Sequence, residues 1–188
     1  MSSVNVANPK TDLTVKIASD FNASIFQKAF ISYADQKNFA NSKAKNNYIL
    51  SLDADEALSD ELILSIQNAL KNPLNNAYQL NRRTNYCGQW INYSGWYPDP
   101  KIRLFDKNYA QWGGPSLHEI LVLKSNATVG ILKGDLLHYS FYTKEDHEKQ
   151  LEKFSSIAAQ DLFSQHKKAS IYNLYIKPIN RFLTDYVF

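Results

Sequence analysis

Three carboxylates stand close together where a short apolar run ends. Residues 48–52 are mostly apolar and long enough for one buried strand, and Asp53, Asp55 and Glu56 follow directly. Open α/β sheets bind their ligands at the carboxyl ends of such strands. On a continuing strand Asp53 and Asp55 would share a face, and crowded carboxylates repel unless a cation lies between them. These oxygen ligands suit Mg²⁺ or Mn²⁺, and Mg²⁺ is commonly held by one or two carboxylates and phosphate oxygens.

The same stretch has a second interpretation that fits the spacing equally well. It could be a solvated turn that leads into a helix beginning at Ser59, because acidic side chains are favoured near the positive end of a helix. A further candidate is Glu119, which stands beside His118 in a Gly-rich loop and could act as a general base or simply lie on the surface. His118 and His138 could contact a metal or a phosphate, or could be hydrogen-bonded structural residues.

Size and composition suit one domain, or one domain with an appendage. The chain has 188 residues, and the aromatic share of 13% includes 12 Tyr. A net charge of +3 is compatible with anionic ligands or an anionic membrane surface, and is too weak to indicate a nucleic-acid partner. Cys87 has no second cysteine to pair with, so we expect a reducing compartment. We expect no signal peptide and no transmembrane helix, because no apolar run is long enough.

The first 72 residues show alternating helix and strand patterns. Helices are expected over 11–20, over 32–46 and from Ser59 to about residue 71, and strands over 24–27 and 48–52. This order predicts parallel strands joined by crossover helices. Beyond it, the strand candidates are 77–81, 89–93, 101–105, 128–132 and 136–139. A capped helix from Thr143 to about His166 and a final helix over 169–188, interrupted near Pro178, complete the prediction.

The region 86–112 is dense in Tyr and Trp, and Arg82, Arg83 and Arg103 lie in or beside it. Tyr and Trp can pack on one side and still form hydrogen bonds, so such a surface would suit sugars, whose C–H faces stack on aromatic rings. For any single ring, ordinary packing in a small sheet is the better expectation.

Several short motifs follow one another along the chain. They are Gln36-Lys-Asn-Phe-Ala40, Tyr48-Ile-Leu-Ser-Leu-Asp-Ala-Asp-Glu56, Asn81-Arg-Arg-Thr-Asn-Tyr86, Gln89-Trp-Ile91, Gly95-Trp-Tyr-Pro-Asp99, Lys101-Ile-Arg-Leu-Phe105 and His118-Glu119. In this order and spacing, over residues 11–188, the chain resembles family 2 glycosyltransferases of the lipopolysaccharide core-type β-glycosyltransferase subgroup. An Asp-x-Asp motif alone is weak evidence, whereas the ordered set is specific.

The resemblance implies a GT-A fold, which is a Rossmann-like α/β/α sandwich. We expect this domain over residues 1–142 and a C-terminal helical extension over 143–188. The implied activity is an inverting transfer of a sugar from a nucleotide-sugar donor, a UDP-sugar above all, to a glycan or lipid-linked acceptor. Such a reaction belongs to the synthesis of lipopolysaccharide and other cell-envelope polysaccharides.

The resemblance also assigns the residues of the donor site. Asp53 and Asp55 match the family's Asp-x-Asp, and they would hold Mg²⁺ or Mn²⁺ with Asp55 as the direct ligand. His138 falls where some relatives offer a further metal or diphosphate contact, and Lys37 matches a basic position near the nucleotide. The metal would stabilise the charge that develops on the leaving diphosphate.

The resemblance assigns a second set of residues to the acceptor and to the cleft. Glu119 falls where relatives carry the base that deprotonates the acceptor hydroxyl, and His118 stands beside it. Arg82, Arg103 and Trp96 would line the donor or acceptor cleft.

The N-terminal part departs from the family pattern. Relatives begin with a strand ending in Asn-Glu and a helix, and then a second strand ending in Asp-Ser-Gly-Ser-Thr-Asp. Here the first two elements are missing, and the second strand ends in Ala7-Asn-Pro-Lys-Thr-Asp12, with Ala7 in place of an Asp that helps to hold the nucleoside. We therefore expect an N-terminally incomplete sandwich with an unpaired strand edge.

These departures keep a second function open. The chain could be a noncatalytic glycan-binding or partner protein, or an inactive fragment, derived from such an enzyme. A metal-dependent phosphohydrolase would fit the acids but neither the Trp-rich middle nor the ordered motifs. We expect a cytoplasmic location, and lipid-linked acceptors would favour the cytoplasmic face of the inner membrane. The final helix, with Lys177 and Arg181 beside an apolar stripe, could lie on a membrane surface, on the catalytic domain or on a second copy.

Overall fold

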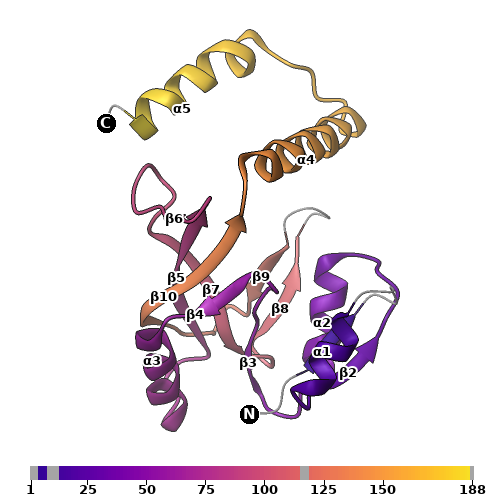
Figure 1. Ribbon diagram of the computed structural model, residues 1–188, viewed down its shortest axis with the longest axis vertical. Coiled ribbons are helices and arrows are strands. Elements are labelled where there is room, and N and C mark those ends of the chain that lie inside the picture. Colours follow the sequence, from indigo (N-terminus) through magenta and orange to yellow (C-terminus); the bar gives the residue numbers. More distant parts are fainter. Residues whose placement is uncertain (1–3, 8–12, 115–118, 187–188) are drawn as a thin grey trace. The chain divides into compact units, whose positions relative to one another are not determined.

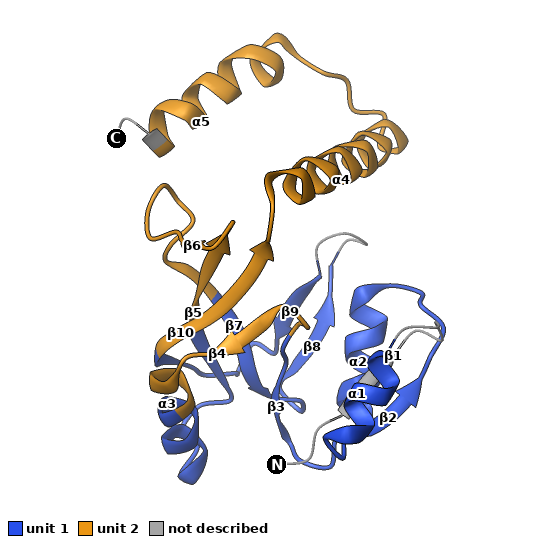
Figure 2. Ribbon diagram, viewed as in Figure 1, with its two compact units in different colours: residues 1–52, 64–80, 101–133 blue, residues 53–63, 81–100, 134–188 orange. Residues whose placement is uncertain are grey.

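The structure is a computed structural model that describes residues 4–7, 13–114 and 119–186. The chain forms two compact units, which are coloured separately in Figure 2. Unit 1 comprises residues 1–52, 64–80 and 101–133, and unit 2 comprises residues 53–63, 81–100 and 134–188. Both α-helices and β-strands are present, and the strands pair in parallel as well as antiparallel fashion. The fold is therefore mixed α/β.

The elements follow one another along the chain, and Figure 1 labels most of them. They are β1 (Val4–Ala7), α1 (Thr14–Asp20), β2 (Ser24–Gln27), α2 (Tyr33–Lys43), β3 (Tyr48–Leu50), β4 (Glu56–Leu58), α3 (Asp60–Lys71), β5 (Ala77–Tyr86), β6 (Gln89–Trp90), β7 (Asp99–Asp106), β8 (Ala110–Gly113), β9 (Ile120–Leu123), β10 (Val129–Phe141), α4 (Lys144–Ser164), the π-helical turn η1 (Tyr172–Ile176) and α5 (Lys177–Tyr186).

The predicted parallel arrangement of the strands over 24–27 and 48–52 is not found, because β2 and β3 belong to separate sheets. In unit 1, β1 and β2 are parallel, with Val4 opposite Ser24. In contrast, β3 is antiparallel to β7, with Tyr48 opposite Asp106, so the expectation of a parallel β3 is wrong. The alternating pattern of the first 72 residues cannot reveal a partner strand that lies more than 50 residues further along. The hydrogen-bonded order is β3-β7-β5-β10-β4, with β6 on β5, while β8 and β9 pair by themselves.

The core of unit 1 contains aromatic residues from the Tyr- and Trp-rich region. Ala77, Phe105, Ala110 and Trp112 are buried together, and the rings of Phe105 and Trp112 meet edge to face at 6.1 Å between centroids. Burial of one such side chain stabilises the fold by about 1.5–3 kcal/mol. Packing in the core of unit 1 therefore accounts for the position of the Trp112 ring.

Unit 2 contains strands that are longer than the sequence pattern predicts. β5 continues past Asn81 to Tyr86, where it turns into β6 through Cys87 and Gly88 at positive φ. The expected strands 128–132 and 136–139 are one strand, β10, which passes through Gly134 at a φ of 87°. β10 is antiparallel to β4, with His138 opposite Glu56. The sequence pattern did not reveal β4, β8 and β9, which form by pairing with β10 and with each other.

The predicted helix caps are present. The Ser59 hydroxyl accepts a hydrogen bond from the Leu62 amide at the start of α3, and Thr143 forms a capping box with Asp146 at the start of α4. The predicted interruption near Pro178 is a π-helical turn, η1, followed directly by α5. A proline has no N–H to donate, and the wider turn accommodates this without ending the helix. Among the described helices, none combines the length and the hydrophobicity needed to cross a bilayer.

Candidate functional site

The three carboxylates lie in a tight turn of unit 2. The Glu56 amide donates to the Asp53 carbonyl at 3.1 Å, and the Asp53 amide donates to Glu56 Oε2 at 2.9 Å. The expectation that Asp53 and Asp55 share one face of a continuing strand is therefore wrong. The Glu56 side chain satisfies the backbone of this turn, and β4 begins at the same residue.

Asp55 meets His138 at this turn. Asp55 Oδ2 lies 3.3 Å from His138 Nε2, and the Asp55 side chain is 48% exposed. The Tyr139 amide donates to the Asp55 carbonyl at 2.9 Å, which fixes the turn against β10. On the other side of the ring, Nδ1 of His138 lies 3.5 Å from the Thr84 hydroxyl of β5. Two residues that the sequence assigned to one metal site are thus neighbours, 83 positions apart in the chain.

Asp55 and His138 fit a divalent cation only if a bound ligand completes its coordination. Within residues 4–7, 13–114 and 119–186, no three side chains of His, Cys, Asp or Glu are grouped as they would be around an ion held by protein alone. Mg²⁺ is commonly bound through one or two carboxylates together with substrate phosphates. Asp55, with His138 beside it, suits a cation of this second kind, which the phosphate oxygens of a ligand complete.

A partly buried ion pair lies in unit 1. Lys37 Nζ of α2 is 2.7 Å from Glu119 Oε1, and the two side chains are 17% and 21% exposed. The same ammonium lies 4.6 Å from the centroid of the Trp112 ring. Glu119 immediately precedes β9, and His118 lies outside the described residues. The structure therefore places the residue assigned as base against the residue assigned to the nucleotide.

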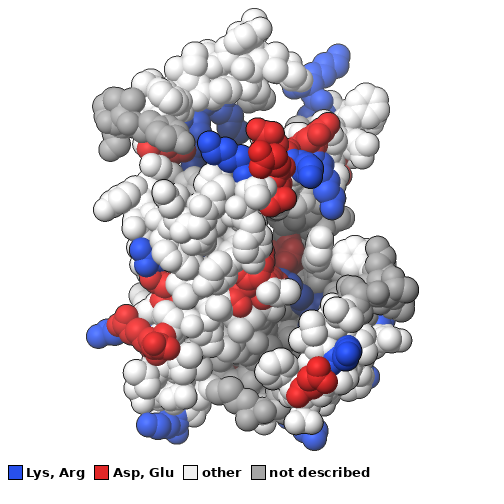
Figure 3. Space-filling view, in the orientation of Figure 1, with Lys and Arg blue, Asp and Glu red and all other residues white. Residues whose placement is uncertain are grey.

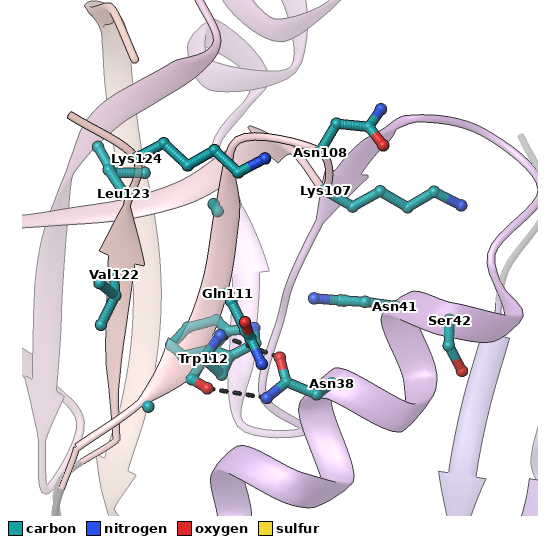
Figure 4. A pocket seen from close by; sticks show the side chains of 12 residues that line it. Asn38, Asn41, Ser42, Lys107, Asn108, Gln111, Trp112, Val122, Leu123 and Lys124 are labelled. Atoms are coloured by element: carbon teal, nitrogen blue, oxygen red, sulfur yellow. Dashed lines mark hydrogen bonds between the residues drawn. The ribbon is translucent and has the colours of Figure 1, made fainter. Parts of the chain in front are cut away.

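Asn38, which follows Lys37 on helix α2, fixes this helix to β8. The Asn38 amide nitrogen donates to the Trp112 carbonyl at 2.8 Å, and the Trp112 amide donates to Asn38 Oδ1 at 2.9 Å. This double hydrogen bond, drawn in Figure 4, mimics the pairing of two strands. It thereby fixes the position of the neighbouring Lys37 along β8.

A groove of about 830 Å³ opens in unit 1 beside this double hydrogen bond (Figure 4). The described residues that line it come from α2, the turn before β8, and the β8–β9 hairpin: Asn38, Asn41, Ser42, Lys107, Asn108, Ala110, Gln111, Trp112, Gly113, Val122, Leu123 and Lys124. Their polar groups are amides, a hydroxyl and two ammonium groups, and none of these described residues is acidic. Such a lining suits a hydroxyl-rich or anionic ligand. The groove was not predicted: Asn38 and the five lining residues within 86–112 fall in stretches with a sequence signal, but nothing in the sequence shows that these stretches meet.

Two of the residues assigned to the cleft lie in unit 2. Arg82 is paired with Asp99, its Nη2 at 2.7 Å and its Nε at 2.9 Å from Oδ2. Trp96 is 36% exposed and meets the ring of Tyr86 edge to face. Arg103 belongs to unit 1 and is buried within β7. Each therefore has a structural contact or a buried position of its own.

The loop that carries Trp96 is anchored through the following residue. The Tyr97 hydroxyl donates to Asp135 Oδ1 at 2.9 Å. This hydrogen bond, with burial as the second cause, raises the pKa of Tyr97. The Asp135 amide in turn donates to the Ser59 hydroxyl at 3.0 Å. The loop, β10 and the N-terminus of α3 are thus tied together.

Comparison with known proteins shows which proteins the chain is similar to. No family model matches the chain. Proteins named uncharacterized glycosyltransferases from Rickettsia typhi and Rickettsia prowazekii are 31% and 30% identical to it, and each alignment covers 95% of this chain. A further one from Rickettsia felis is 28% identical over 90% of the chain. Over most of its length the chain is homologous to these proteins. It spans 64% of the length of the first two.

Proposed function

We propose that the chain is an inverting glycosyltransferase of family 2 with a GT-A fold. It would move a sugar from a nucleotide-sugar donor to a glycan or lipid-linked acceptor, in the synthesis of lipopolysaccharide or another cell-envelope polysaccharide. The observation that carries the proposal is the similarity, over 95% of the chain, to proteins named glycosyltransferases. The ordered motifs of the sequence support the finer assignment.

In this proposal Asp55 and His138 bind the diphosphate end of the donor. Asp55 is half exposed, lies 3.3 Å from His138, and can bind Mg²⁺ or Mn²⁺ jointly with diphosphate oxygens. When bound, the cation would supply positive charge against the charge that develops on the leaving group. The backbone bond from Tyr139 to Asp55 holds the turn in place, so the carboxylate needs little reorganisation to bind. Asp53 would contribute through the same turn.

Glu119 would act as the base toward the acceptor. The acceptor hydroxyl oxygen forms a bond to the anomeric carbon, the bond from that carbon to the diphosphate oxygen breaks, and the hydroxyl proton passes to Glu119. Lys37 binds Glu119 Oε1 at 2.7 Å, so it would position the carboxylate while Oε2 takes the proton. General-base catalysis of this kind contributes roughly 10²–10⁴-fold in rate.

A noncatalytic glycan-binding function is the second candidate, and the ion pair favours it. A carboxylate that is already held by Lys37 in a partly buried position can serve packing alone. The polar groove of unit 1 would then be the binding surface for a sugar or an anionic glycan.

Calorimetric titration distinguishes the two functions. The whole chain is titrated with UDP and with UDP-glucose, each with and without Mn²⁺, after circular dichroism has shown that it is folded. If the chain is a transferase, both nucleotides should bind much more tightly with Mn²⁺ than without it, or should bind only when Mn²⁺ is present. A folded chain that binds neither nucleotide in any condition would contradict the proposed transferase and leave the glycan-binding function.

A further inference from the structure

The last helical segment of unit 2 carries a large exposed apolar surface. We call residues 171–186, which comprise η1 and α5, the C-terminal segment. Eight of its side chains are large, apolar and 38–74% exposed. They are Ile171, Tyr172, Leu174, Tyr175, Ile176, Ile179, Phe182 and Leu183. Soluble monomers rarely expose so many neighbouring apolar groups, and such patches mark interaction sites.

The polar side of α5 is turned toward its own unit. Arg181 Nη2 and Asp185 Oδ1 are the nearest atoms to a side chain built on Gly95, at 3.3 and 3.5 Å. The two residues also pair with each other at 2.6 Å, and the Asp185 side chain is only 15% exposed. An amphipathic helix that completes the core of its own protein buries its apolar stripe. α5 does the reverse, so its apolar side is available to a partner.

The charge of the segment indicates the kind of partner. The segment contains two basic side chains, Lys177 and Arg181, and one acidic one, Asp185, which is paired with Arg181; two further lysines, at 167 and 168, precede it. The preceding helix α4 differs, because it contains five acidic and three basic residues. Figure 3 shows this contrast as mixed red and blue over α4 and a mostly uncharged surface over α5. The C-terminal segment thus combines apolar and positively charged side chains with little negative charge.

We propose that the C-terminal segment lies in the interface of a lipid bilayer that carries anionic headgroups. Its apolar side chains would enter the boundary between headgroups and acyl chains, and Lys177 would contact phosphate groups. Interfacial helices have this composition, with cations on the polar side and aromatic and aliphatic residues on the other. The inference does not depend on the transfer reaction.

Vesicle sedimentation tests the proposal with the whole chain. Sucrose-loaded vesicles of phosphatidylcholine alone, or with one third phosphatidylglycerol, are mixed with the protein, and the bound fraction is measured at low and high salt. We expect binding to the anionic vesicles that falls as salt rises. Lys177→Gln should weaken it roughly fivefold, because one cation near an anionic surface contributes about that factor. Ile179→Glu should weaken it by roughly tenfold or more.

Matched substitutions elsewhere separate this effect from general charge or hydrophobicity. Lys153→Gln removes the same charge from α4, and Leu74→Glu makes the same kind of change at a residue that is 81% exposed. Both variants should bind as the parent chain does. Absence of binding to anionic vesicles, or equal losses in the control variants, would overturn the proposal.

A second measurement needs no substitution. Vesicles should slow amide hydrogen exchange in residues 171–186 and leave that of α4 unchanged. Unchanged exchange in the C-terminal segment, or a dimer in light scattering that Ile179→Glu dissociates without any vesicle binding, would assign the surface to something other than a membrane.

Discussion

Replacement of Gly134 by alanine tests how closely β10 approaches α3 in unit 2. Gly134 has a φ of 87°, and a Cβ at this position would lie 2.4 Å from the Leu62 amide nitrogen. It would also lie 2.9 Å from the Glu61 carbonyl carbon and from the Leu62 Cα. All three are backbone atoms, so no side-chain rotation can relieve the contacts. The backbone of the strand or of the helix has to move.

The expected loss of stability has two parts. A non-glycine residue at this backbone conformation costs about 1 kcal/mol. Forced overpacking of a closely packed site costs about 1–3 kcal/mol. The movement also stretches the pair of hydrogen bonds between Ser59 and Asp135, at 3.0 and 3.1 Å. We therefore expect Gly134→Ala to lower the free energy of unfolding by about 2–4 kcal/mol.

Gly88→Ala is the matched control in a urea titration. Gly88 has a φ of 86°, and a Cβ built there meets nothing within 4 Å. This variant should therefore lose only the stability that its backbone conformation costs a non-glycine residue, about 1 kcal/mol. The difference between the two variants isolates the steric term, provided that the m-value does not change. Equal losses in the two variants would refute the close approach of β10 to the helix.

Three further predictions concern the candidate site and its anchors. Asp55→Ala should weaken Mn²⁺-dependent UDP binding by roughly tenfold or more, whereas Asp161→Asn on α4 should not; unchanged binding in Asp55→Ala would remove Asp55 as a ligand. Glu119→Gln should spare donor binding and lower the transfer rate by roughly 10²–10⁴-fold, and retained transfer would remove Glu119 as the base. The hydrogen bond to Asp135 is the main cause of the raised pKa of Tyr97. The protonated Tyr97 hydroxyl therefore contributes fully to stability below about pH 10. This contribution is lost as the pH rises toward the folded-state pKa. Tyr97→Phe should therefore lose less stability than the parent chain between pH 9.5 and 11 in urea titrations, and parallel losses would contradict the assignment.

Elements with local signals were the ones that the sequence predicted well. The strand over 24–27, the Ser59 cap of α3 and the capping box of α4 are all present as predicted. Each depends on residues within one turn or one strand. β8 and β9 have no such signal, since their stability comes from pairing with each other and, for Trp112 of β8, from packing on Phe105.

Long-range contacts explain what the sequence could not predict about the site. The pair of Lys37 and Glu119 joins residues 82 positions apart, and nothing in the spacing of either residue shows that they meet. The same limit applies to aromatic residues. Trp112 and Trp96 lie in one Tyr- and Trp-rich region, yet Trp112 is 6% exposed and Trp96 is 36% exposed. Burial of a ring depends on which strand it faces, and residue type alone does not reveal this.

The acidic turn shows that the two interpretations of one motif do not exclude each other. Glu56 closes the turn through the Asp53 amide, as the structural interpretation requires of an acid in this position. Asp55, two residues away from Asp53, is half exposed and faces His138, as the ligand-binding interpretation requires. A turn that is closed by its own carboxylate holds the neighbouring carboxylate in a fixed orientation at little cost in conformational entropy. Such preorganisation is what a weakly held cation needs when its remaining ligands arrive with the substrate.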